Sequence, residues 1–122
     1  YVEIARNAGA GETLDRIIPE IYNEAMFPGT AMLYSFPSYV YSLWQEYSVE
    51  ELEYIASFCK EKGIPAATVY WEYWSEETEK IFEKNGISLY VYTVNDRDQA
   101  RRYISQGAEG ICTDFLTAED LW

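Results

Sequence analysis

Three short junctions in the second half of the chain constrain its fold more than any other feature of the sequence. Each has a polar helix end, a glycine and then an apolar residue, at Lys62-Gly63-Ile64, Asn85-Gly86-Ile87 and Gln106-Gly107-Ala108. Glycine adopts the left-handed conformation without Cβ strain, so it is the preferred residue just after a helix. The glycines are 86 − 63 = 23 and 107 − 86 = 21 residues apart, which leaves room for one short strand and one helix per unit. This spacing predicts a βα repeat and therefore a parallel sheet of the α/β class.

The residues between the junctions change their hydrophobic period as a βα repeat requires. Ser48 and Glu51 form a capping box for a helix whose apolar residues keep helical spacing as far as Cys59. Ser75 is expected to cap a second helix, and Asn95 or Asp96 a third. Short apolar runs predict strands at residues 66–70, 89–94 and 110–113. The run at 89–94 lacks polar alternation, which is typical of a strand covered on both faces.

The first part of the chain is less regular. We expect a helix over residues 1–8, a strand over 16–22 that Pro19 weakens, a short helix over 23–27 that ends before Pro28-Gly29, and a strand over 39–43. The whole chain then has about five strands and four or five helices. No low-complexity linker interrupts it, so residues 1–122 form a single segment.

The charge of the chain excludes two classes of partner. Asp and Glu number 21 against 9 Lys and Arg, a net charge of 9 − 21 = −12, and the only close basic pair is Arg101-Arg102. Such a charge repels phosphate backbones and anionic membrane surfaces, so we expect neither nucleic-acid binding nor docking on an anionic membrane. No apolar run approaches the roughly 20 residues of a transmembrane helix. At 48% hydrophobic residues the chain can still bury a core.

The absence of histidine limits the chemistry that this chain can do. Histidine is the usual proton shuttle near neutral pH and the commonest metal ligand, and the sequence has none. Catalysis would fall to carboxylates, Tyr, Lys or Cys. Cys59 and Cys112 have no CxxC spacing, so both are expected to be buried small hydrophobic residues rather than nucleophiles.

Four segments together resemble the C-terminal half of glycerophosphodiester phosphodiesterases. They are Ile17 to Glu24, Lys62-Gly63-Ile64 leading into Ala67-Thr68-Val69, Val91 to Asp96, and Gly107 to Phe115. The last two have the forms V-x-T-V-N-D and G-x-x-G-I-x-T-D and are the most specific. The resemblance implies a partial TIM barrel of the phosphatidylinositol-phospholipase-like kind, about half of the barrel, with strands five to eight of the eight.

The same resemblance implies an activity that this chain does not complete. The family hydrolyses glycerol phosphodiesters to an alcohol and glycerol 3-phosphate, a reaction of lipid metabolism, with a pair of histidines and a Glu-x-Asp pair that holds a divalent metal, Ca or Mg. Those residues belong to the N-terminal half of the barrel. The chain begins at Tyr1 rather than Met, in what reads as the middle of a helix, which suggests that it comes from a longer protein. We therefore expect no catalytic residue, metal ligand or cofactor in this chain and no activity from it alone.

Two other interpretations stay open at this stage. One is a non-catalytic half-barrel that serves as a binding or assembly module. The other is an unrelated α/β domain, such as a doubly wound sheet. An incomplete barrel would also leave two sheet edges open, so a homodimer that closes them is expected.

Three residues are candidates for contact with a glycerophosphodiester substrate. By resemblance, Tyr92 stands where the family often has Trp or His facing glycerol, although it could equally be a packed barrel aromatic. Glu20 stands where many relatives have Gln, and it could bind a metal or a hydroxyl group or be a structural polar residue. Asp114 could meet the ligand or cap the segment from Thr117 to Leu121.

An aromatic cluster lies outside these motifs. Trp71-Glu72-Tyr73-Trp74 follows a predicted strand, at the end where barrel ligands bind. It could stack on a sugar or a lipid headgroup. The alternative is a hydrophobic cover over the barrel rim or a partner interface.

Overall fold

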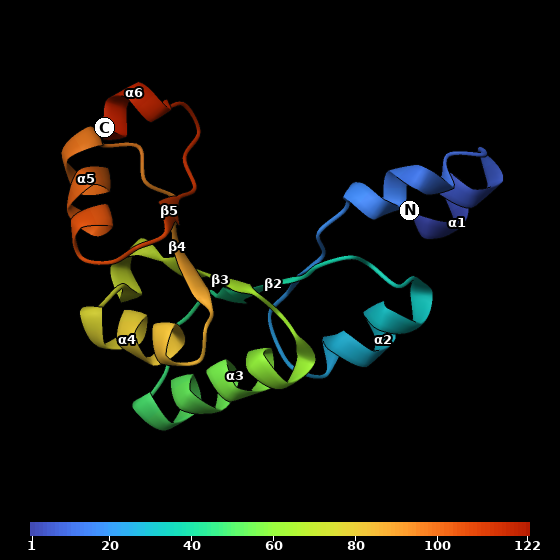
Figure 1. Ribbon diagram of the computed structural model, residues 1–122, viewed down its shortest axis with the longest axis horizontal. Coiled ribbons are helices and arrows are strands. Elements are labelled where there is room, and N and C mark those ends of the chain that lie inside the picture. The colour runs from blue at the N-terminus through green and yellow to red at the C-terminus, as the bar shows by residue number, and fades with distance from the viewer.

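The computed structural model describes residues 1–122 and confirms the α/β fold class. A five-stranded parallel sheet has the order β1-β2-β3-β4-β5, so strands that follow one another in sequence lie side by side (Figure 1). This order, with helices between the strands, is that of a partial TIM barrel. The strands are β1 (Glu20–Ile21), β2 (Val40–Leu43), β3 (Ala66–Tyr70), β4 (Ser88–Tyr92) and β5 (Gly110–Ile111).

The helices follow the strands in alternation. Figure 1 shows α1 and α2 towards one end of the molecule and α5 and α6 at the other. The α-helices are α1 (Val2–Asn7), α2 (Met26–Leu33), α3 (Val49–Lys62), α4 (Glu76–Lys84), α5 (Arg97–Ser105) and α6 (Ala118–Leu121). Two 3-10 helices are η1 (Gly11–Arg16) and η2 (Trp71–Tyr73). No helix is long and apolar enough to cross a membrane.

The predicted helix boundaries of the repeat are confirmed. At the start of α3, the Ser48 hydroxyl accepts from the Glu51 backbone N–H at 3.2 Å, and the Glu51 carboxylate accepts from the Ser48 backbone N–H at 2.7 Å. Ser75 caps α4, and Asp96 rather than Asn95 caps α5. The junction glycines Gly63, Gly86 and Gly107 have φ of 69°, 73° and 109°, the left-handed region that favours glycine.

The core lies between the sheet and helices α3, α4 and α5. In β3 and β4, buried side chains alternate with half-buried ones, and the buried set is Ala67, Val69, Leu89 and Val91. The expectation that the strand at residues 89–94 is covered on both faces is therefore wrong. Its other face, with Tyr90 and Tyr92, is only half-buried, so the sheet has a covered outer face and a more open inner face.

The N-terminal part differs from expectation in two places. Residues 16–22 were expected to form one strand, but Arg16 ends η1 and only Glu20–Ile21 pairs with β2. Helix α2 was expected to end before Pro28-Gly29, but it begins at Met26 and contains both. Pro28 is its third residue, where the missing N–H costs no intrahelical hydrogen bond.

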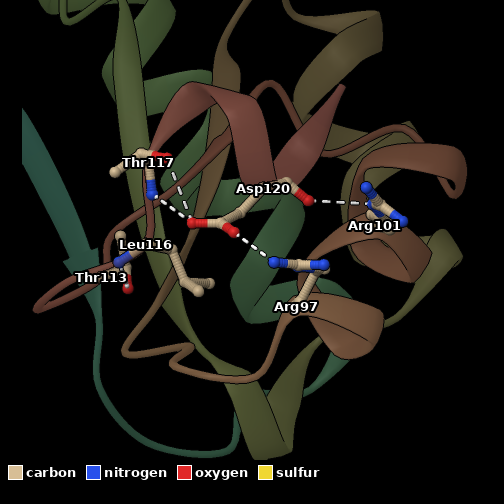
Figure 2. Close-up of polar contacts among 6 residues, drawn as sticks. All are labelled: Arg97, Arg101, Thr113, Leu116, Thr117 and Asp120. Carbon is tan, nitrogen blue, oxygen red and sulfur yellow. Dashed lines mark hydrogen bonds and ion pairs between the residues drawn. The ribbon is translucent and has the colours of Figure 1, made fainter.

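Polar contacts hold the short last helix against α5 (Figure 2). The Asp120 carboxylate accepts from the Thr117 backbone N–H at 2.9 Å and from Arg97 Nη2 at 2.7 Å. Arg101 Nε donates to the Asp120 carbonyl at 2.9 Å. A capping residue at the start of α6 therefore also ties this helix to its neighbour.

Candidate functional site

A hollow lies on the open inner face of the sheet, towards the carboxyl ends of the strands. It has a volume of about 380 Å³ and is lined by Glu20, Tyr22, Ser42, Trp44 and Tyr92. These side chains come from β1, β2 and β4 and from the residues just after β1 and β2. In a βα barrel, ligands bind at this end of the strands. We call this site the inner hollow.

Tyr92 faces both the inner hollow and its neighbours on the sheet. Its hydroxyl lies 3.5 Å from Ser42 Oγ and 3.5 Å from the Leu43 carbonyl oxygen. Hydrogen bonds between oxygens are usually shorter, about 2.5–3.0 Å, so both contacts are weak. The Tyr92 ring packs against Tyr70, with 5.8 Å between the centroids. The packing and ligand interpretations of this residue are thus compatible.

Glu20 lies on the same inner hollow as Tyr92. It is exposed on β1, and neither ion pair of the structure involves its carboxylate. The negative charge of Glu20 also acts on the Cys112 thiol: burial is the larger cause of the raised pKa of that thiol, and the Glu20 charge is the smaller one. The structure therefore brings together two of the three residues named from the sequence.

Asp114 lies away from the inner hollow, in the loop after β5. Its carboxylate accepts from Asn95 Nδ2 at 2.8 Å, while Asn95 Oδ1 accepts from the Thr113 hydroxyl at 2.9 Å and from the Asp114 backbone N–H at 3.0 Å. The cap of α6 is Thr117 with Asp120, so the capping role considered for Asp114 is wrong. Asp114 instead joins the loops that follow β4 and β5.

Three residues of the inner hollow were not named from the sequence. Tyr22 is two residues after Glu20. In the next strand, Ser42 and Trp44 are two and four residues after Val40. Side chains of a strand alternate between its faces, so this period of two places all of them on the inner face. Counting by twos from Glu20 and Val40 would have identified them.

The aromatic cluster at residues 71–74 divides between two neighbours: Trp74 packs on α5, and the rings of Trp71 and Tyr73 pack on Tyr70. Trp74 Nε1 donates to Gln106 Oε1 at 3.1 Å, and its ring meets Tyr103 edge to face with 5.8 Å between centroids. The Tyr103 hydroxyl donates to the Trp71 carbonyl at 3.4 Å. None of these aromatic residues lines the inner hollow. This arrangement favours the hydrophobic cover over a ligand-stacking loop.

The cysteines have the surroundings of inert side chains. Cys59 is fully buried, and burial raises the pKa of its thiol to about 12. Cys112 is half-buried and forms no disulfide. A thiol that stays protonated at neutral pH is a poor nucleophile, so neither cysteine offers catalytic chemistry.

The residues of this chain do not fit the divalent metal that the family resemblance implies. No group of three or more Asp, Glu, Cys or His side chains lies close enough together to hold a metal ion. Hard divalent cations take several oxygen ligands.

Comparisons with known proteins agree with the fold. The sequence model of the glycerophosphoryl diester phosphodiesterase family matches residues 30–118, well over half of the chain. Among solved structures, the chain is similar to a candidate glycerophosphoryl diester phosphodiesterase from Silicibacter pomeroyi DSS-3, with a TM-score of 0.69 and 17% sequence identity. The match covers 93% of this chain and 40% of that one, so the chain spans less than half of that structure. A comparison with curated proteins finds no match. On the family match, this chain belongs to the glycerophosphoryl diester phosphodiesterase family.

Proposed function

We propose that this chain is the C-terminal half of a barrel that hydrolyses glycerol phosphodiesters to an alcohol and glycerol 3-phosphate, and that it supplies part of the substrate-binding wall. The observation that carries the proposal is the inner hollow, which both Glu20 and Tyr92 line on the open face of the sheet. The family membership supports the same reaction class. This activity would place the protein in lipid metabolism.

The side chains of the inner hollow suit a polyol better than a phosphate. Hydroxyl groups of Ser42 and Tyr92 both donate and accept hydrogen bonds, and the Glu20 carboxylate accepts them. The carboxylate repels a phosphodiester anion, so the glycerol hydroxyls lie towards Glu20 and the phosphate away from it. Trp44 offers an aromatic face to the apolar side of the glycerol.

Proton transfer and metal binding fall to residues outside this chain. The sequence has no histidine and the structure has no cluster of metal ligands. Chemistry at the phosphorus therefore requires the rest of the barrel. In this proposal the described residues bind and orient the glycerol part of the substrate.

The test measures turnover with and without the rest of the protein. We expect the purified 122-residue chain to release no glycerol 3-phosphate from glycerophosphocholine with Ca²⁺ or Mg²⁺, and the whole protein to release it. In the whole protein, Tyr92→Ala is expected to raise KM about tenfold with little change in melting temperature, because one substrate contact of about 1.4 kcal/mol is lost. Metal-dependent turnover by the chain alone would contradict the proposed division of roles.

The missing histidine also favours a second candidate function. A half-barrel without acid–base residues could serve as a non-catalytic binding or assembly module. The same assay separates the two candidates, because a module would bind the diester without hydrolysing it even in the whole protein.

The open sheet supports self-association as a further part of the proposal. Strands β1 and β5 are the two edges of the sheet and each has only two paired residues. Open edges and a half-buried inner face are stabilised by pairing with another chain. In the absence of the other barrel half, we expect the chain to form a homodimer, and light scattering that gives 14.2 kDa at high concentration would contradict this.

A further inference from the structure

A second cavity adjoins the inner hollow and has a different chemical character. It has a volume of about 570 Å³ and is formed by the residues after β1, by β2 and the residues after it, and by the first two turns of α3. Tyr22 and Trp44 line both spaces, so the two are neighbours. We call this second space the aromatic cavity.

The lining of the aromatic cavity combines aromatic rings with carboxylates. The aromatic residues are Tyr22, Tyr41, Trp44, Tyr47 and Tyr54, and the carboxylates are Glu24, Glu50 and Glu51. No Lys or Arg lines it, so no cation of the protein neutralises these carboxylates from within the cavity. Aromatic faces and carboxylates both attract cations, and an anion would be repelled.

Glu24 is the carboxylate that the fold holds in place. It is half-buried, and its Oε1 accepts from the Tyr41 hydroxyl at 3.2 Å. Tyr41 is 1% exposed, so this donor is fixed in the core. Burial, and then the charge of Glu24, keeps the pKa of Tyr41 far above its ordinary value, so the hydroxyl stays protonated and continues to donate. The negative charge of Glu24 therefore has a defined position in the cavity wall.

Two other acceptors of the cavity are already engaged. Glu51 accepts from the Ser48 backbone N–H at 2.7 Å, and Asn23 Oδ1 accepts from the Met26 backbone N–H at 3.2 Å. A primary ammonium group has three donors to satisfy when it leaves water. A quaternary ammonium group has none and is held by aromatic faces and charge alone. The five aromatic residues and the carboxylates of the lining thus suit a quaternary ammonium group.

We propose that the aromatic cavity binds a quaternary ammonium group, and that in the substrate this group belongs to the alcohol part of a zwitterionic glycerol phosphodiester. The second half of this statement rests on the proposed function, because it requires the glycerol part to occupy the inner hollow. The net charge of −12 acts in the same direction. It attracts a cation and repels a diester whose alcohol is neutral or anionic and whose net charge is therefore negative.

The first test measures binding of choline to the 122-residue chain, followed by tryptophan fluorescence or by amide chemical shifts. The matched probe is 3,3-dimethylbutan-1-ol, which has the shape of choline without its charge. We expect choline to bind at least about tenfold more tightly than the neutral probe. Equal affinity for the two probes, or no binding of choline, would overturn the proposal.

Variants assign the binding to the cavity. Glu24→Gln keeps an oxygen that can accept from Tyr41 and removes the charge, and we expect choline to bind about tenfold more weakly. Trp44→Leu removes an aromatic face from a side chain that is 55% exposed, so folding is retained and the same weakening is expected. The control is Glu53→Gln, an exposed residue of α3 that does not line the aromatic cavity. Equal weakening by Glu24→Gln and Glu53→Gln would reduce the effect to the overall charge and overturn the site.

A second test uses the whole protein and separates this inference from the proposed function. We expect kcat/KM for glycerophosphocholine to exceed that for glycerophosphoglycerol about tenfold, and Glu24→Gln to remove most of the difference. Equal turnover of the two diesters would keep the proposed function and overturn the substrate assignment. Choline binding that depends on Glu24, with no hydrolysis of any diester, would overturn the proposed function and leave the cation site standing.

Discussion

The βα repeat from β2 onward and the segment before it use their apolar residues differently. Each long helix of the repeat buries side chains against the sheet: α3 buries four, and α4 and α5 bury two each. Helices α1 and α2 bury none. Among their apolar side chains, Ile4 is 72% exposed and Met32 is 87% exposed. Figure 1 shows the same contrast, with α1 standing apart from the helices that line the sheet.

The two regions differ in whether the chain itself supplies the packing partner of each apolar face. A βα unit brings its strand and helix together, so its core is complete within the chain. The first segment has apolar residues without a complete unit, and only Leu14, Ile21 and Tyr39 in it are buried. This agrees with the proposal that the chain is one half of a larger barrel.

The largest expected effect tests whether stability resides in the repeat. Phe82 of α4 is fully buried, and we expect Phe82→Ala to lower the free energy of unfolding by about 3–5 kcal/mol. The matched change in the first segment, Met32→Ala, removes a side chain that is 87% exposed, and we expect less than about 0.5 kcal/mol. Urea unfolding of both variants measures the difference. Similar losses would show that the two regions share one core.

A smaller effect is expected from one glycine in each region. A Cβ at Gly110 would lie 2.8 Å from two ring carbons of Tyr90, whereas one at Gly29 would meet no atom within 4 Å. We expect Gly110→Ala to cost about 1–3 kcal/mol. We expect Gly29→Ala, inside α2, to stabilise by up to about 1 kcal/mol.

The Gly110 effect has its own control. If the Tyr90 ring causes the loss, Tyr90→Leu combined with Gly110→Ala is expected to lose less than the sum of the two single changes. Additive losses in urea unfolding would place the cause in the backbone of β5 instead.

Helix capping gives a third effect, near 1 kcal/mol. The reciprocal bonds of Ser48 and Glu51 begin α3, while α2 has no side-chain cap. We expect Ser48→Ala to cost about 1 kcal/mol. Ser57→Ala, at an exposed position inside the same helix, is the control and is expected to be neutral or slightly stabilising. Equal unfolding midpoints for wild type and Ser48→Ala would contradict the role of the capping box.

The accuracy of the sequence-based predictions follows the same division. Caps and left-handed glycines are local signals, so Ser48, Ser75 and Gly63 marked the ends of their helices correctly. The length of β1 depends on pairing with β2, which is non-local, and the expected strand over residues 16–22 was too long. Pro28 was misread because a proline that ends a helix and one in a first turn look alike in sequence.

The candidate site was predictable where strand alternation identifies a face. Glu20 and Tyr92 were named separately and share the inner hollow because both point inward from parallel strands. Asp114 lies outside the inner hollow, and the path of its loop after β5 is set by the hydrogen bonds of Asn95, which the sequence does not specify. The aromatic cavity combines residues from three segments whose packing is equally non-local.

The smallest expected effect concerns acid and the last helix. Hydrogen bonds from the Thr117 backbone, and then from Arg97, hold the pKa of Asp120 below its ordinary value. Because the pKa is lower in the folded state, the ionised carboxylate stabilises the docking of α6. This contribution is complete above the unfolded-state pKa of about 4, and it is lost as the pH falls through the lower folded-state pKa.

We therefore expect the amides of α6 to exchange faster with solvent below about pH 4, after correction for intrinsic rates, while those of α3 change little. Asp120→Asn is expected to give the faster exchange already at pH 7 and to remove the pH dependence. Glu119→Gln, an exposed neighbour on the same helix, is the control and is expected to behave as wild type. If neither acid nor Asp120→Asn changes the amide exchange rates of α6, this carboxylate does not hold the last helix in place. The contacts of Leu116 and Leu121 with the core would then do so.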